Sequence, residues 1–411
     1  MERGTDRAVV HAMLPVYRRR AGSEDEDPSG AKLKAWVEST CQMVEFGFIN
    51  YHKPESKPQV AIFWINQKGD KIPNGHIGWG EKRTNFMKTY LGHQFVFEDV
   101  QTGEVLLEHT IEFTGVRAIG EYRSSIEPGA DKSSEVHDGV AGMWNSHFSV
   151  RRTFTELGFS KGRLPDDVFA SMGAFNYNND KYKSLEELTG VFLNTWEQDV
   201  KFIQIPWDLK VVWQTRIKEL VEAWAGCDLE NTDMYGLRRY DEGARLLTHV
   251  DRITTHAASV IINVAQGNLS QPWTVEVHDH ADRLHEVVME PGDIVYYESA
   301  KCLHGRNTPL TGNGAYYTNV FSHYRPTGDP EWYLRDNPDG TPDPLIDVGE
   351  CELVGPPDAY SSGSVQCDDP RIGLHLSPSM FTAKSGEDLF HWWQRVGGGL
   401  SEEREGHHSE L

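Results

Sequence analysis

The segment LLTHVDRITTH runs from Leu246 to His256 and carries the pattern that decides the fold. It places His249 and Asp251 two residues apart, next to apolar residues. On a β-strand, residues i and i+2 point to the same face, so this pair offers a nitrogen and a carboxylate oxygen to one point in space. Alone, the pair also fits two polar residues on an ordinary strand edge.

A second segment, MEPGDIVYYESAKCLHGR (289–306), adds a third polar residue of the same kind. It contains a Pro-Gly-Asp turn, the apolar strand pattern DIVYY and then His304. Two histidines and one carboxylate on neighbouring strands of a β-barrel form the facial triad of non-haem Fe(II) oxygenases. His249, Asp251 and His304 are therefore the predicted metal ligands. Such a triad leaves other positions on the metal open.

The composition narrows the class of protein. The chain has 411 residues and a formal net charge of −22, and its five cysteines are dispersed. This length fits two or three domains. The negative charge argues against a nucleic-acid binder, because phosphate neutralisation requires clustered Lys and Arg. No apolar run reaches the roughly 18 residues of a membrane-spanning helix.

The periodicity predicts an α+β, mainly β fold. From Met234 to Pro326 short apolar strand patterns follow one another, separated by Pro-Gly and Gly-Asn turns. Ahead of them, apolar residues from Leu209 to Trp224 recur at helical spacing, and Gly226 ends this helix. Ser184 and Glu187 form a capping-box pattern that predicts another helix start. This order favours a β-sandwich or barrel supported by helices.

The strand-rich region resembles the 2-oxoglutarate- and Fe(II)-dependent oxygenases. The likeness lies in RRYDEGARLLTHVDR, SVIINVAQ and EPGDIVYYESAKCLHGR, and it is strongest to prolyl 4-hydroxylases, especially those of algae and other protists. It implies a double-stranded β-helix (jelly-roll) domain in which His249, Asp251 and His304 ligate Fe(II). It also implies 2-oxoglutarate and O₂ as co-substrates and ascorbate as a reductant of over-oxidised iron.

The resemblance implies that Tyr240 belongs to the 2-oxoglutarate site. This chain differs from the family, however, at the residue that binds the far carboxylate of 2-oxoglutarate. The family has Arg or Lys about ten residues after the distal histidine, whereas this chain has Ala315 near that place. A buried carboxylate requires a charged partner. Arg306 is the nearest candidate and Arg252 is another, with Asn319 or Thr318 completing the pocket.

Four further histidines lie near the predicted site: His256, His278, His280 and His285. The stretch HDHADRLH (278–285) superficially looks like a metal-binding tract. We interpret it as a polar hairpin with exposed histidines, because nothing supplies a second closed ligand set.

A front region, 60–113, resembles the β-domain of the von Hippel–Lindau tumour suppressor family, chiefly in FWIN and TYLGHQFVFED. That family recognises hydroxyproline in peptides. The resemblance carries a hydroxyproline pocket onto Trp64, Thr89 and His93, with Phe95 where the family has a tryptophan. The alternative, equally open, is that Trp64 and Phe95 are core residues of a small β-sandwich.

We therefore expect five regions: a partly flexible leader (1–55), the β-domain (56–118), a connecting region (119–183), the oxygenase domain (184–335) and a loop-rich extension (336–411). The expected reaction is hydroxylation of a prolyl residue in a peptide or protein. Two alternatives remain: hydroxylation of a free amino acid or small metabolite, and a non-catalytic jelly-roll binding protein. The intact triad argues against the last.

The ends of the chain give opposing indications of location. The first twenty residues lack the apolar stretch of a signal peptide, which favours the cytoplasm. The final residues His408 to Leu411 loosely match an endoplasmic-reticulum retention tetrapeptide, which favours the lumen of that compartment.

Overall fold

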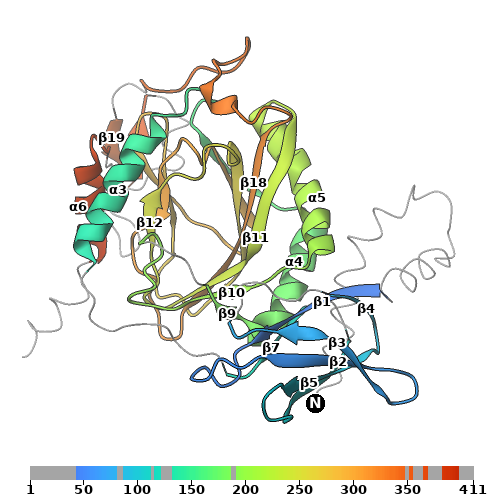
Figure 1. Ribbon diagram of the computed structural model, residues 1–411. Coiled ribbons are helices and arrows are strands. Elements are labelled where there is room, and N and C mark those ends of the chain that lie inside the picture. The colour runs from blue at the N-terminus through green and yellow to red at the C-terminus, as the bar shows by residue number, and fades with distance from the viewer. Residues whose placement is uncertain are drawn as a thin grey trace, which may run out of the picture.

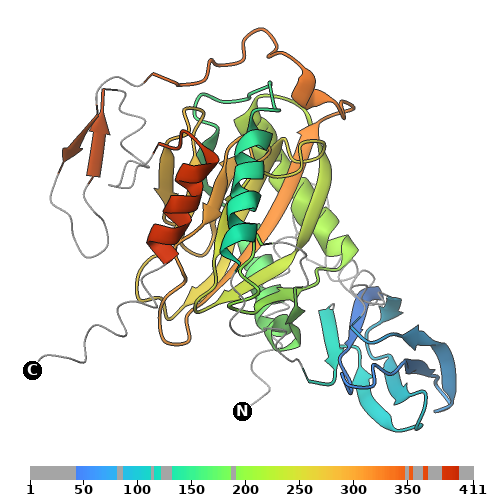
Figure 2. The same ribbon diagram turned by 60° about the vertical axis from the view of Figure 1, so that its left-hand side comes forward.

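The computed structural model describes residues 43–80, 87–112, 115–121, 132–186, 191–347, 351–354, 364–368 and 382–397. These residues form a large β-rich body and a smaller β-domain at the front of the chain (Figures 1 and 2). The first 42 residues, and with them most of the expected leader, lie outside the described part. Strands predominate over helices, as the sequence predicts.

Eight consecutive strands of the large body alternate between two sheets, except that the fourth and fifth form a hairpin within one sheet. They are β11 (Leu229–Asp241), β12 (Leu246–His249), β13 (Ala258–Gly267), β14 (Val275–His278), β15 (Leu284–Val287), β16 (Asp293–Tyr297), β17 (His304–Arg306) and β18 (Tyr316–Pro326). One sheet contains the order β16-β13-β18-β11, and the other has the order β12-β17-β14-β15. This alternation is the topology of a double-stranded β-helix, which confirms the predicted fold of this region.

The larger sheet is extended at both edges by strands that lie earlier in the chain. Strand β8 (Phe159–Arg163) pairs with β16, while β10 (Val200–Ile203) pairs with β11 and with β9 (Ser184–Leu185). The capping-box prediction at Ser184 is wrong, because this residue lies in a strand paired with β10. The region expected to be a connection therefore contributes directly to the large body.

Helices cover the outer face of each sheet (Figure 1). Helices α4 (Asp166–Asn179) and α5 (Trp207–Ala225) lie against the larger sheet. Helix α5 matches the predicted amphipathic helix and ends at Gly226, whose φ of 68° is the left-handed conformation that glycine adopts readily. Helices α3 (Ser133–His147) and α6 (Gly386–Gly397) pack together beside β12.

The front domain consists of two small sheets. One has the order β4-β1-β7 and the other β3-β2-β5-β6. Their strands are β1 (Met43–Asn50), β2 (Val60–Ile65), β3 (Lys71–Ile77), β4 (Met87–Tyr90), β5 (Gln94–Asp99), β6 (Val105–Thr110) and β7 (Gly115–Ile119). Phe46, Phe48, Ile62 and Phe97 contribute to one buried core between them. Strand β1 pairs with both β4 and β7, so the domain begins ahead of the expected boundary at residue 56.

The front domain docks on the large body through β7. The backbone N–H of Val116 donates to Asn179 Oδ1 over 3.2 Å, and this contact is buried. The guanidinium of Arg117 lies 3.7 Å from the ring centroid of Tyr182, which belongs to the 3₁₀ helix η1 (Asp180–Tyr182). A short segment, 183–186, then leads from this contact into the interior of the large body.

The C-terminal region contains more regular structure than the expected loop-rich extension. Residues Trp332–Leu334 form the 3₁₀ helix η2, and β19 (Cys351–Val354) pairs with β20 (Ser364–Cys367) so that Cys351 and Cys367 are register partners. Among the described residues, no helix combines the length and the apolar composition that spanning a membrane would require.

Glu276, which is 1% exposed, ties β14 to the end of β17 and to α6. Its carboxylate accepts hydrogen bonds from the Asn307 backbone and side-chain amides and from Trp392 Nε1. Replacing Glu276 with alanine leaves these buried donors unpaired, so we expect a loss of about 3 kcal/mol in the free energy of unfolding. Chemical denaturation measures it. Glu290→Ala, at an exposed position just before β16, is the control and should change the free energy of unfolding by less than about 0.5 kcal/mol.

Candidate metal centre and adjoining cavity

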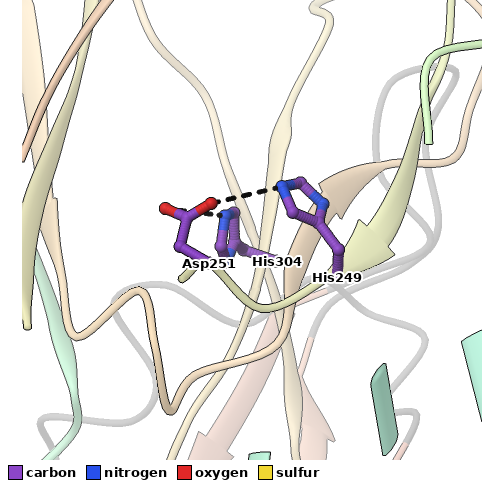
Figure 3. Close-up of side chains that lie close together, drawn as sticks. All are labelled: His249, Asp251 and His304. Carbon is purple, nitrogen blue, oxygen red and sulfur yellow. Dashed lines mark ion pairs between the residues drawn. The ribbon is translucent and has the colours of Figure 1, made fainter. Parts of the chain in front are cut away.

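The three predicted metal ligands come together where β12 ends and β17 begins. His249 and His304 are register partners in the antiparallel pair formed by these strands. Asp251 follows two residues after His249, and its backbone N–H donates to the carbonyl of Ser299 over 2.8 Å. Figure 3 shows the Asp251 carboxylate facing both imidazoles.

The distances suit a metal ion that is bound from one side. His249 Nε2 lies 3.7 Å from Asp251 Oδ1, and His304 Nε2 lies 3.8 Å from Asp251 Oδ2. One ligand atom from each residue falls within 4.8 Å of the others. Metal–nitrogen bonds of roughly 2.1 Å place adjacent ligand atoms about 3 Å apart. Small side-chain rotations therefore suffice for coordination.

The hydrogen bonds of the two histidines fix which nitrogen faces the metal site. His249 Nδ1 lies 2.7 Å from the carbonyl oxygen of Leu247, and His304 Nδ1 lies 2.9 Å from that of Cys302. A carbonyl oxygen can only accept, so Nδ1 carries the proton in both rings. Both Nε2 atoms then present lone pairs towards Asp251, which is the arrangement that orients metal-ligating histidines.

The electrostatics favour the protonation states that a metal requires. Burial lowers the pKa of His304 to about 4 and also lowers the pKa of His249. Burial by itself would raise the pKa of the Asp251 carboxyl, but the neighbouring His304 and His323 outweigh it and hold that pKa well below its usual range. At neutral pH the site therefore offers two neutral imidazoles and one carboxylate.

A second group, Asp251, His256 and His323, also brings potential ligand atoms within 4.8 Å of one another. However, the rings of His256 and His323 are stacked, with centroids 3.7 Å apart and planes inclined by 23°. A metal must lie near the plane of each imidazole that binds it, so one ion cannot satisfy two nearly parallel rings. As they stand, these two histidines form a wall beside the metal centre.

The expectation of exposed histidines in 278–285 is wrong. His278 and His285 are fully buried, as is His256. His285 Nε2 lies 2.9 Å from Asp279 Oδ2, which also accepts from Arg283 Nε over 2.8 Å. Asp279 thus pairs with both side chains inside the body, and among the described residues His278, His280 and His285 belong to no candidate metal-binding group.

A cavity of about 400 Å³ adjoins the three ligands. Such a volume is typical of small-molecule sites. Its polar side chains come from both sheets and from the segment before β10, and its apolar part is mainly aromatic. The lining residues are Glu186, Phe192, Leu193, Tyr235, Arg238, Leu246, His249, Asp251, Arg252, His256, Tyr297, His304, Phe321 and His323.

Three residues predicted for the co-substrate, Tyr240, Arg306 and Asn319, form a buried polar row and do not themselves line this cavity. Tyr240 is fully buried, and Arg238 Nη1 lies 3.4 Å from its hydroxyl oxygen. The Arg306 guanidinium lies 4.3 Å from the ring centroid of Trp273 and 4.4 Å from that of Tyr317. Asn319 is 0% exposed, and neither atom of its amide has a hydrogen-bond partner. Arg252, the other cation considered, lies at the exposed rim of the cavity.

Sequence reasoning did not find Arg238, Tyr235 or His323, which also line the cavity. The strand pattern places alternate residues on one face, whereas Tyr235 and Arg238 are three apart. A register shift between Met234 and Leu237 explains this spacing, because a bulge changes which residues face inward. The adjacent arginines at 238 and 239 could have indicated this, because neighbouring residues on a strand face opposite sides and one of the two must therefore point inward.

In the front domain, three of the residues predicted to form the hydroxyproline pocket lie together. Thr89 Oγ1 is 3.0 Å from His93 Nδ1, and the rings of Trp64 and His93 have centroids 5.3 Å apart. Trp64 Nε1 is buried without a hydrogen-bond partner. Phe95 is a buried member of the domain core, as the alternative interpretation expects.

Comparison with known proteins gives structural likenesses only. No family model and no curated protein sequence matches the chain. A prolyl-4-hydroxylase from Pseudomonas putida shares 16% identity and a TM-score of 0.33, covering 46% of this chain and 100% of its own. A Trichoplax adhaerens prolyl hydroxylase with a hypoxia inducible factor peptide has 11% identity and a TM-score of 0.32. That match covers 47% of this chain and 90% of the hydroxylase.

A third similar structure is HygX from Streptomyces hygroscopicus with nickel and 2-oxoglutarate bound. It has 10% identity and a TM-score of 0.32, and the match covers 42% of this chain and 84% of HygX. At such values the likenesses do not decide what this chain does. The functional argument therefore rests on the strand topology and on the geometry of the site.

Gly305 separates His304 from Arg306 at the closest approach of β17 to β12. A Cβ atom there would lie 2.8 Å from the carbonyl oxygen of Leu246 and 2.9 Å from the backbone nitrogen of Thr248. We expect Gly305→Ala to push the two strands apart and to weaken Co(II) binding roughly tenfold or more. Calorimetric titration measures this affinity.

Gly173→Ala, on α4, is the matched control because a Cβ there would meet no atom within 4 Å. It should leave Co(II) affinity unchanged. If a folded Gly305→Ala protein bound Co(II) with unaltered affinity, the close contact between β12 and β17 would not be what sets the spacing of the metal ligands.

Proposed function

We propose that this chain is an Fe(II)- and 2-oxoglutarate-dependent oxygenase that hydroxylates a prolyl residue in a peptide or protein. The observation that carries the proposal is the set His249, Asp251 and His304, with both Nε2 lone pairs held towards one carboxylate beside a cavity. Two histidines and a carboxylate on one face suit Fe(II) and leave positions for a chelating co-substrate and O₂.

In this proposal the protein's residues have distinct tasks. His249, Asp251 and His304 hold the iron, which supplies O₂ activation when bound. Tyr240, Arg306 and Asn319 contribute polar groups to the 2-oxoglutarate site. One O₂ is consumed as 2-oxoglutarate becomes succinate and CO₂ and a substrate C–H bond becomes C–OH. Ascorbate would return over-oxidised iron to Fe(II).

The buried positive charge near Tyr240 supports an anionic co-substrate. Arg306 is 2% exposed, and among the described residues no carboxylate lies within ion-pair distance of it. Its Nη1 donates to the carbonyl of Trp273, while Nη2 has no partner. A buried cation without a counter-charge is costly, so a bound carboxylate would stabilise it.

The choice of a prolyl substrate rests on the sequence resemblance to prolyl 4-hydroxylases. A small metabolite or free amino acid is the competing substrate class, because a cavity of about 400 Å³ accommodates either a side chain or a small molecule. A binding protein without catalysis is the third possibility. Turnover assays with and without peptide separate the three.

Purified protein with Fe(II), 2-oxoglutarate and ascorbate should release succinate, and a proline-rich peptide should stimulate the release. His249→Ala should abolish it by removing an iron ligand, whereas His391→Ala, on the exposed side of α6, should not change it. Succinate assay and peptide mass measure the outcome. Release indifferent to peptide would favour a small substrate, and no release with iron bound would favour a binding protein.

For the front domain we propose recognition of hydroxyproline, which would join a reader of the product to the enzyme that makes it. Trp64, Thr89 and His93 support this role, because an aromatic wall beside hydroxyl and imidazole groups suits a hydroxylated pyrrolidine ring. The unpartnered indole N–H of Trp64 adds a donor. Binding at a second site would raise the effective concentration of the peptide at the first.

Binding to the full chain carrying His249→Ala tests this role without turnover. We expect a hydroxyproline peptide to bind more tightly than its proline counterpart in a fluorescence-polarisation titration. Trp64→Ala should remove the difference, whereas Trp207→Ala, on an exposed tryptophan of α5, should preserve it. Equal binding of the two peptides would refute recognition of the hydroxyl group.

A further inference from the structure

Arg238 and Glu186 form a bidentate ion pair on the wall of the cavity. Arg238 Nε and Nη2 lie 2.5 Å and 2.6 Å from the two carboxylate oxygens of Glu186. Both residues line the cavity that contains the metal-binding set. This fork-to-fork geometry is the one by which arginine binds a carboxylate ligand.

The remaining surroundings of Arg238 are also suited to a carboxylate. Its Nη1 lies 3.4 Å from the hydroxyl of Tyr240, and its register partner on β18 is Asn319. Register partners in a sheet point to the same face, so Asn319 lies beside Arg238. The Asn319 amide is fully buried and has no partner at either atom. Because buried polar groups normally have hydrogen-bond partners, a bound ligand would supply the partner that this amide lacks.

The two arginines near Tyr240 differ in their carboxylate partners. Burial raises the pKa of the Tyr240 hydroxyl, while the positive charges of the nearby Arg238 and Arg306 act to lower it. Glu186 neutralises one of them, and among the described side chains Arg306 has no carboxylate partner. Near Tyr240, the Arg306 guanidinium is therefore buried without a carboxylate partner, and a bound carboxylate would supply one.

We infer that Arg238 binds the far carboxylate of 2-oxoglutarate and that Glu186 occupies Arg238 until this carboxylate displaces it. The inference rests on the proposed function and specifies how its co-substrate is held. Glu186 is an internal competitor, since one bidentate carboxylate replaces another at the same guanidinium. Tyr240 and Asn319 then donate to the incoming carboxylate, and Arg306 supports it electrostatically.

Internal competition lowers the apparent affinity by the fraction of time that Arg238 is available. If Arg238 is free in about a tenth of the molecules, removing the competing charge raises the affinity for 2-oxoglutarate about tenfold. A 2-oxo acid of the same length without the far carboxylate, 2-oxopentanoate, gains nothing from the same change. The ratio of the two affinities therefore reports the occupant of Arg238.

The experiment titrates the anaerobic Fe(II) protein with 2-oxoglutarate and with 2-oxopentanoate by calorimetry, without measuring turnover. Glu186→Gln should raise the affinity for 2-oxoglutarate about tenfold and leave the affinity for 2-oxopentanoate unchanged. The double variant Glu186→Gln, Arg238→Gln keeps a neutral pair of similar shape, and it should abolish the preference for the dicarboxylate. Fe(II) affinity should be the same in all these proteins.

The adjacent pair Arg239–Asp180 provides the matched control. Arg239 Nη1 lies 2.6 Å from Asp180 Oδ1, and Arg239 follows Arg238 on β11 but does not line the cavity. Asp180→Asn should therefore leave both affinities unchanged. An equal response to Asp180→Asn and Glu186→Gln would overturn the inference, because it would reflect general loosening of β11.

The remaining outcomes separate this inference from the proposed function. If the wild-type protein prefers 2-oxoglutarate but Glu186→Gln does not change the ratio, the far carboxylate binds elsewhere, for example at Arg306, and only the inference fails. If the affinity for both acids rises by the same factor, Glu186 acts only by occupying space, and the inference also fails. If the Fe(II) protein binds neither acid, the proposed function fails as well.

Discussion

The antiparallel pairing of β12 with β17 is the contact on which the site depends. It places His249 opposite His304, and it is close enough that only a glycine fits between His304 and Arg306. The same strands then direct Arg306 into the buried polar row and the turn after β12 directs Asp251 towards both imidazoles. Helices α3 and α6 press on β12 from outside, so the C-terminal helix helps to hold a site formed by residues far earlier in the chain.

The sequence predicted those parts of the site that depend on local spacing. The His-x-Asp pair is readable because two residues on one strand share a face, and the distal histidine follows a recognisable turn and strand. Parts that depend on pairing were not predictable in this way. Arg238 faces the cavity because of a register shift in β11, and Ser184 joins a strand because β10 lies beside it, despite its capping-box pattern.

Burial of polar groups gave the largest error, and its cause is also long-range. The sequence of 278–285 favours a solvent-facing hairpin, yet His285 is buried and its Nε2 pairs with Asp279, which also accepts from Arg283. Burial of such a group depends on whether a partner is available, and composition alone does not reveal the partner. In contrast, helix α5 was predictable throughout, because its apolar stripe and terminal glycine are properties of one continuous segment.

The docking of β7 on α4 and η1 has a geometric consequence for the two proposed peptide sites. Val116 and Arg117 contact Asn179 and Tyr182, and these contacts help to hold the front domain at a defined separation from the candidate metal ligands. A flexible tether would accept prolines at many separations along a target chain. If the two proposed sites bind one target chain, a separation held by this contact would set the interval between the prolines that are hydroxylated.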